Sequence, residues 1–270
     1  MEKKSKKTGI SVTGIIIIVL AASVFLFSAY KLISIYLEYQ RGDKEYESLI
    51  EEVVTIETVE VEKDEEKQEE KIPEVKTVFK VDFDKLLSIN PDTIGWIRFE
   101  NPEKISYPVV KTSDNDKYLK TTFEGKTNSA GAIFADAGGS KDFSDKNTFL
   151  YGHNMKNGSM FGQLRKYKTE SFCKENPYFY IYTPDGKEIK YQVFSVCVVE
   201  DTSQSYDKYY TDDAEYSEYI KHIRNMSLYD VGVEVTAESQ IVSLSTCTNV
   251  TDTQRLLVHG VKISEETVGE

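Results

Sequence analysis

The chain has 270 residues, which is enough for one or two domains. Hydrophobic residues make up 40% of it, and 18 Tyr with 13 Phe can supply a large core, so the composition excludes a wholly disordered chain. The formal net charge of −12 argues against a general nucleic-acid binder, because neutralising phosphates requires clustered Lys and Arg.

The N-terminus predicts a membrane anchor. Residues 1–8 hold four lysines, and no charged residue follows from Gly9 to Tyr30. About 20 apolar residues can cross the hydrocarbon core as a helix, so we expect a transmembrane segment over 9–37. The basic residues before it and acidic residues after it predict a cytoplasmic N-terminus. A cleaved signal peptide is the alternative, but the apolar run is longer than usual and no A-x-A cleavage site follows it.

Residues 38–80 are dominated by Glu, Lys and Val and predict an acidic linker that is helical at its start. The run 57–71 contains no aromatic residue and cannot bury enough apolar surface to fold alone. A charged tether that extends by self-repulsion explains this run better than a binding motif does.

The folded domain is expected over 81–266, with a short tail at 267–270. Its pattern predicts a mostly β fold with a short helix at 83–89, further helices at 114–121 and 160–168, and one longer amphipathic helix at 212–226. Eight short strand patterns with turn signals between them predict a closed or nearly closed β-barrel. These patterns cover residues 94–99, 105–110, 131–136, 148–153, 178–183, 188–200, 240–246 and 256–264.

The segment 243–260 predicts two strands joined by a short polar loop, with Cys247 ending the first strand and Arg255 opening the second. A lone Cys is usually a buried small hydrophobe, but the polar residues that follow Cys247 favour a position at the rim of the sheet. Cys173 and Cys197 are expected to be structural, and a disulfide between them stays open. Three cysteines without C-x-x-C spacing indicate neither a disulfide framework nor zinc.

His153 lies at a strand end in L-Y-G-H-N-M, where a loop can expose it. Beside Cys247 it could act as an imidazolium and give a proton to a leaving amine, and Arg255 could stabilise an oxyanion. His222 and His259 are expected at the surface or in packing. The Asp-rich loop 136–145 could hold calcium, but a solvated turn is the better explanation.

The chain order of the candidate His and Cys, and the motifs around them, distinguish between the families of thiol enzymes. His precedes Cys, unlike in papain-like enzymes, and the caspase Q-A-C-x-G and the S-x-G-C of L,D-transpeptidases are absent. Instead the chain has T-F-L-Y-G-H-N-M, then S-L-S-T-C-T, then Arg255 eight positions beyond the Cys. With these motifs, residues 81–264 closely resemble the sortases, and within that family class B. The long helix expected before the Cys-bearing strand also resembles class B.

The resemblance implies a sortase-like β-barrel and a single-pass membrane enzyme of a Gram-positive bacterium, with its catalytic domain outside the cell. Such a cysteine transpeptidase cleaves a C-terminal sorting signal, here of the N-P-x-T type, through a thioacyl on Cys247, with His153 as acid and base and Arg255 orienting the signal. It then transfers the secreted protein to an amine of a cell-wall precursor. No metal or organic cofactor is implied. The resemblance places signal contacts at five positions: Asn115, Leu119, Tyr151, Ser245 and Thr246.

Two alternatives stay open at this point. One is a non-catalytic, membrane-tethered β-domain that binds wall components or a partner, although such a module would need no Cys, His and Arg together. The other is a thiol hydrolase that cuts without joining, since both reactions share one acyl-enzyme. Wall anchoring, haem-protein anchoring and pilus assembly are equally open.

Overall fold

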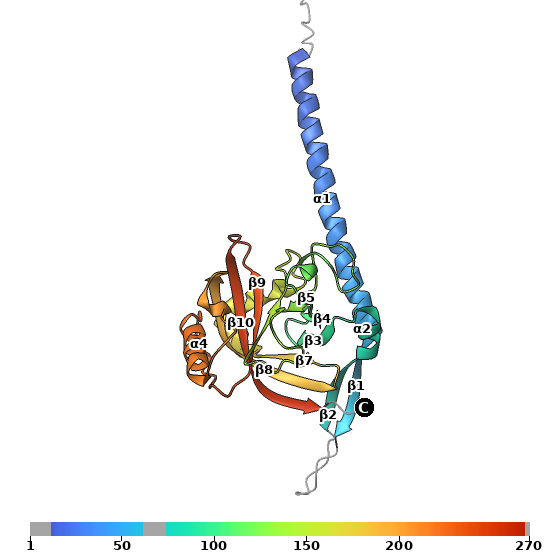
Figure 1. Ribbon diagram of the computed structural model, residues 1–270. Helices are drawn as coiled ribbons and strands as arrows, with labels where there is room; N and C mark the ends of the chain where they lie inside the picture. Colours follow the sequence, from blue (N-terminus) through green and yellow to red (C-terminus); the bar gives the residue numbers. More distant parts are fainter. Residues whose placement is uncertain (1–11, 62–73, 268–270) are drawn as a thin grey trace, which may run out of the picture. The chain divides into compact units, whose positions relative to one another are not determined.

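The computed structural model of the protein describes residues 12–61 and 74–267 (Figure 1). The chain divides into two compact units, Met1–Arg41 and Gly42–Glu270. The basic segment 1–8, most of the acidic run 57–71 and residues 268–270 of the expected tail lie outside the described residues.

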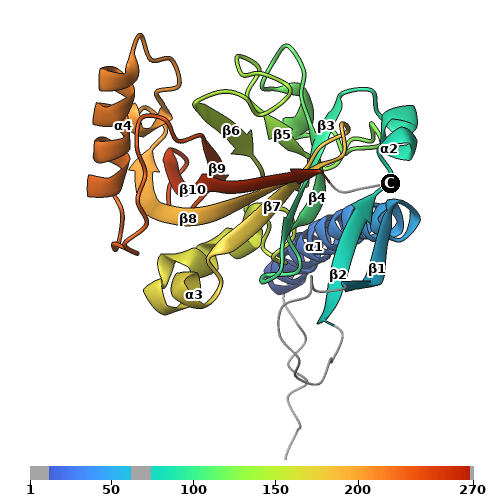
Figure 2. The ribbon, with the colours of Figure 1, turned by 90° about the horizontal axis from the view of Figure 1, so that it is seen from below.

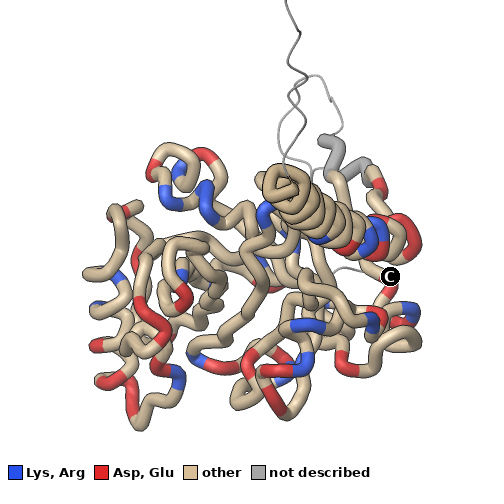
Figure 3. The backbone as a smooth tube through the Cα atoms, turned by 90° about the horizontal axis from the view of Figure 1, so that it is seen from above, with Lys and Arg blue, Asp and Glu red and all other residues tan. Residues whose placement is uncertain are grey.

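Helix α1 (Val12–Val53) begins as the expected apolar segment. Within the described part of the chain it is the one helix long and apolar enough to cross a membrane, with a mean hydropathy of 2.6 over its most apolar stretch. Its first part carries no charged residue, and charges gather toward its end (Figure 3). Large apolar side chains such as Ile16, Phe25 and Leu26 are exposed, as a lipid-facing helix requires.

The segment expected as a linker is more ordered than its composition indicates. Helix α1 continues to Val53, and β1 (Val54–Val61) then pairs antiparallel with β2 (Glu74–Val81). The last part of α1 buries Gly42, Glu45, Tyr46, Leu49 and Val53, whose spacing of three and four residues places them on one helix face. The end of α1 therefore packs within the folded unit, while the domain boundaries drawn from the sequence stay a prediction.

The folded unit is a closed eight-stranded barrel, as predicted. Going round the barrel, the strands follow the order β10-β8-β7-β3-β4-β5-β6-β9 (Figure 2). Two neighbouring pairs, β4 with β5 and β6 with β9, are parallel. The strands are β3 (Thr93–Phe99), β4 (Ser106–Val110), β5 (Ile133–Ala135), β6 (Asn147–Tyr151), β7 (Tyr178–Tyr182), β8 (Lys187–Glu200), β9 (Ile241–Cys247) and β10 (Gln254–Thr267).

The helices are short, apart from α1 and α4. The helix expected over 114–121 is a single 3₁₀ turn, η1. The helices that follow α1 are α2 (Phe83–Ile89), η1 (Lys117–Leu119), η2 (Phe161–Lys168), α3 (Glu170–Glu175), η3 (Gln204–Tyr206) and α4 (Asp213–Asn225).

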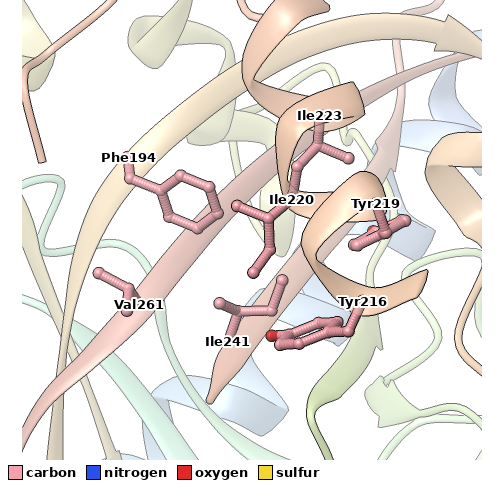
Figure 4. Packing of buried hydrophobic residues seen from close by; sticks show 7 residues of the cluster. All are labelled: Phe194, Tyr216, Tyr219, Ile220, Ile223, Ile241 and Val261. Atoms are coloured by element: carbon pink, nitrogen blue, oxygen red, sulfur yellow. The ribbon is translucent and has the colours of Figure 1, made fainter. Parts of the chain in front are cut away.

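Helix α4 is the predicted amphipathic helix, and it covers the barrel beside the Cys-bearing strand. The Asp212 side chain caps it by accepting a hydrogen bond from the Glu215 N–H. Its buried stripe of Tyr216, Tyr219, Ile220 and Ile223 packs onto β8, β9 and β10 through Phe194, Ile241 and Val261 (Figure 4). This cluster supports the strand that ends at Cys247.

Candidate active site

Strand pairing brings the three candidate catalytic residues to one rim of the barrel. In the antiparallel β9–β10 pair, Cys247 lies directly opposite Arg255, so their side chains share a face and are neighbours. In the parallel β6–β9 pair, Tyr151 lies beside Ser245. His153 and Cys247 each follow that pair by two residues, which places them at the same edge.

Two asparagines join the ends of these strands. The Asn154 side chain donates through Nδ2 to the Cys247 carbonyl at 2.8 Å. The Asn249 side chain donates in return to the Asn154 carbonyl at 2.9 Å. Asn249 has a φ of 62°, a left-handed conformation that Asn tolerates better than most residues. The backbone segments that carry His153 and Cys247 are thus tied directly to each other.

A pocket of about 450 Å³ opens at this rim. All eight residues predicted for catalysis or signal binding line it, together with six that were not predicted. The predicted ones are Asn115, Leu119, Tyr151, His153, Ser245, Thr246, Cys247 and Arg255. The others are Phe134, Asp136, Gly152, Asp201, Tyr206 and Lys208. Cys247, His153 and Arg255 are all partly buried, so a peptide entering the pocket could reach them.

The His153 ring is oriented by a backbone carbonyl. Its Nε2 lies 2.7 Å from the Leu119 oxygen. A carbonyl oxygen can only accept a hydrogen bond, so Nε2 carries a proton and donates. In the neutral ring Nδ1 is then the basic nitrogen, and the bond to Leu119 fixes both the tautomer and the direction in which Nδ1 points.

The Arg255 guanidinium is held at the edge of the pocket by the Asp201 carboxylate and by the backbone carbonyls of Asp252 and Gln254. Nη2 lies 3.1 Å from the Asp201 carboxylate, and Nη1 donates to the Asp252 carbonyl at 2.7 Å. A planar fork with several donors can keep these partners and still present further N–H groups to a ligand. The arrangement fixes a permanent positive charge beside Cys247.

A family model described as Sortase domain matches residues 101–263. Sortase B of Listeria monocytogenes is 33% identical over 184 residues, 67% of this chain and 73% of the relative. A Bacillus anthracis sortase B structure matches with a TM-score of 0.68 at 32% identity, covering 85% of this chain and 100% of its own. A Staphylococcus aureus sortase B–substrate complex matches at 0.62 and 29% identity, covering 67% and 84%. The chain is a class B sortase.

As a sortase the protein is a cysteine transpeptidase, and its eight-stranded barrel is the one seen in its structural neighbours. The non-catalytic binding domain that the sequence left open is therefore set aside.

A buried carboxylate organises the floor of the pocket. Asp136 is 3% exposed; its Oδ2 accepts from the Tyr151 hydroxyl at 2.9 Å and the Asn115 amide at 3.2 Å. Its Oδ1 accepts from Lys208 Nζ at 2.6 Å and the Gly138 N–H at 2.8 Å. Burial alone raises the pKa of Asp136, but the bonds from Lys208, Gly138 and Tyr151 outweigh it and hold the pKa below its usual value.

Most of loop 136–145 is exposed or partly exposed, as expected for a solvated turn. Its first residue, Asp136, departs from that expectation, because it is buried and anchors two signal-binding candidates. Among the residues that the structure describes, no group of three or more His, Cys, Asp or Glu could hold a metal.

Sequence reasoning missed the pocket wall supplied by the connection between β8 and α4. The Tyr206 hydroxyl lies 2.7 Å from Ser245 Oγ, and its ring stacks on Phe149 with centroids 5.5 Å apart. Lys208 and Asp201 come from the same connection. Tyr206, Lys208 and Asp201 form no recognisable sequence motif. They reach the pocket because the connection between β8 and α4 folds back over β9. The only local indication in the sequence was Asp201, a polar residue directly after strand β8.

The three thiols differ in environment. All are free, so the Cys173–Cys197 disulfide left open by the sequence is absent. Cys173 and Cys197 are buried, whereas Cys247 is partly exposed. Burial raises the pKa of both buried thiols, that of Cys197 to about 12, so they remain neutral and unreactive at physiological pH. Cys247 is the thiol accessible from the pocket.

Proposed function

We propose that this sortase cleaves a C-terminal sorting signal of the N-P-x-T type in secreted proteins and joins the product to an amine of the cell wall. The observation that carries the proposal is the strand register, which brings His153, Cys247 and Arg255 to the lining of one pocket. Related solved structures hold sortase B with a substrate and with triglycine, which supports a peptide donor and an amine acceptor.

The reaction proceeds through a thioacyl-enzyme. The Cys247 thiolate attacks the carbonyl carbon of the Thr of the signal, and the tetrahedral intermediate expels the amine of the next residue, which takes a proton from the His153 imidazolium. The acyl group is now on sulfur. An acceptor amine attacks it, the neutral His153 ring removes the proton from the attacking nitrogen, and Cys247 leaves as a thiolate.

Arg255 supplies charge where the oxyanion develops or holds the backbone of the signal, because its guanidinium is anchored beside Cys247 by Asp201. Asn115, Leu119, Tyr151, Ser245 and Thr246 would contact the signal from the pocket wall. Asn115 and Tyr151 both donate to Asp136, so these two contacts are fixed before the signal arrives.

The enzyme works at the outer face of a Gram-positive cell membrane in this proposal. The apolar part of α1 spans the membrane, the preceding lysines keep the N-terminus in the cytoplasm, and the barrel lies outside. Reaction of a cysteine-specific, membrane-impermeant reagent with Cys247 in intact cells would support this orientation.

A transfer assay tests the proposal. The full-length protein in mild detergent is incubated with N-P-x-T-x peptides, with and without triglycine, and the products are followed by liquid chromatography and mass spectrometry. We expect cleavage after Thr and a ligated product in the presence of amine. His153→Ala should abolish both, whereas the control His222→Ala should retain them. Cleavage without ligation to any amine would make the protein a hydrolase, and no cleavage of any peptide would overturn the proposal.

A further inference from the structure

One turn of α1 contacts a loop beside the active site through polar side chains. The Tyr46 hydroxyl donates to the Gly131 carbonyl at 2.6 Å and accepts from the Phe123 N–H at 3.2 Å. Glu45 accepts from the Glu124 N–H at 3.2 Å. Both side chains are almost fully buried, at 4% and 8% exposure. Three backbone groups of the loop 118–131 are therefore satisfied by one helix turn.

This loop holds the carbonyl that orients His153. The loop closes on itself, since Ala132 N–H donates to the Tyr118 carbonyl at 3.0 Å and Asn128 N–H to the Lys120 carbonyl at 3.0 Å. Leu119, whose carbonyl accepts from His153, lies between these closing bonds. Gly131 has a φ of +58°, and a Cβ there would meet the Tyr118 oxygen at 2.3 Å. The Gly131 backbone thus lies close against the backbone of Tyr118 and Leu119, so a displacement of Gly131 would also displace those two residues.

The same turn also supports the segment that follows His153. The Tyr46 ring packs edge-on against Tyr107 with centroids 5.3 Å apart, and the Tyr107 hydroxyl accepts from the Met160 N–H at 2.9 Å. Met160 pairs with Asn154, next to His153. In addition, Asp43 accepts from the Asn157 amide at 2.8 Å. The loop that bonds the His153 ring and the segment that follows His153 in the chain therefore both contact the turn Gly42–Tyr46.

We propose that Gly42–Tyr46 is a positioning element of the active site, which holds His153 in register with Cys247 through the loops 118–131 and 154–160. The turn does not touch the reacting atoms. Its effect is on the direction of the imidazole, and the proposal rests on the catalytic role proposed above for His153. Burial raises the pKa of Tyr46 well above its usual value, so its hydroxyl keeps the proton that it donates to Gly131.

The test uses the full-length protein in detergent and the variant Tyr46→Phe, which keeps the ring on Tyr107 but leaves the Gly131 carbonyl and the Phe123 N–H without their partner. Tyr36→Phe, at an exposed position of the same helix, is the matched control. The chain has only 3 histidines, so ¹⁵N labelling of the imidazole rings gives a spectrum that His→Ala variants can assign completely.

We expect Tyr46→Phe to shift the His153 ring resonances and to leave those of His222 and His259 in place. The kcat for signal cleavage should fall about tenfold with little change in KM, because orientation rather than binding is lost. Tyr36→Phe should match the wild type in every readout. A purely structural role would lower the melting temperature without moving the His153 resonances selectively.

Unchanged His153 resonances in Tyr46→Phe would overturn the inference. The His153 resonances are measured without substrate, so they test the positioning element even if the wild-type protein cleaves no signal. Absence of cleavage by the wild type would refute the proposed function alone. If Tyr46→Phe fails to fold, Asp43→Ala removes only the exposed contact to Asn157 and must produce a smaller shift of the same resonances. No shift there would also contradict the inference.

Discussion

Acid should destabilise this sortase through His259, which is completely buried in β10. Its Nδ1 lies 2.7 Å from Ser243 Oγ, and Ser243 gives its only proton to Asn147 Oδ1 at 2.7 Å. His259 Nδ1 must therefore donate, which leaves Nε2 to accept from the Cys197 thiol 3.7 Å away. This arrangement accommodates a neutral ring only. Burial, with a smaller contribution from His222, lowers the pKa of His259 to about 3.

A depressed histidine pKa has a definite consequence for stability. The unfolded chain binds a proton at His259 near the ordinary pKa of 6.5, whereas the folded protein binds it only near 3. The stability is complete above about pH 6.5 and is lost as the pH falls toward 3, at about 1.4 kcal/mol per pH unit. Between pH 7 and pH 5 the expected loss from this group is about 2 kcal/mol.

Urea unfolding in non-ionic detergent, followed at pH 7 and pH 5, measures this loss. His259→Asn keeps a donor for Ser243 but cannot titrate, so the wild type should lose about 2 kcal/mol more than this variant between the two pH values. The control His222→Asn, at a partly exposed position, should behave like the wild type. Equal losses in the wild type and His259→Asn would refute the reasoning.

Three further predictions concern the pocket. A cysteine-specific reagent should add once and rapidly to the native protein, at Cys247, whereas Cys173 and Cys197 should react only after unfolding; fast labelling of a buried thiol, seen by peptide mapping, would contradict the burial argument. Arg255→Lys should lower kcat/KM at least about 100-fold in peptide cleavage assays, because a point charge cannot replace the fork, and near-normal turnover would remove Arg255 from the mechanism. Asp136→Asn should raise KM for the signal several-fold in initial-rate measurements and leave kcat within about twofold, because the pocket floor loses the charge that pairs with its neighbours; an unchanged KM would exclude that role.

The sequence predicts the part of the site whose geometry depends on neighbouring residues in the chain. The hairpin that places Cys247 opposite Arg255 follows from two β-prone runs and a short loop. His153 could be placed beside them only through the resemblance to a family, because the parallel pairing of β6 with β9 joins segments far apart in the chain. The burial of Asp136 was missed for the same reason, since three of its four donors come from Asn115, Tyr151 and Lys208, which lie in other segments of the chain.

The N-terminal region shows the same limit. The helical pattern after the apolar segment was visible, but the burial of Tyr46 depends on what the helix packs against, and that information lies in the loop 118–131. Composition also hid β1, because a Val- and Glu-rich strand paired with β2 resembles a charged linker in its residue content. Propensity describes the segment alone, whereas pairing partners decide its structure.

The central claim is that Cys247 is the nucleophile of a thioacyl transfer, and the most direct measurement is the intact mass of the protein after mixing with an N-P-x-T-x peptide. We expect a mass increase equal to the acyl group of the signal fragment that ends in Thr, which is the fragment acid less one water. The added group should be located on Cys247 by peptide mapping and discharged by added triglycine. The Cys247→Ala variant should stay folded and gain no mass. An adduct on another residue, or equal labelling of Cys247→Ala, would contradict the account.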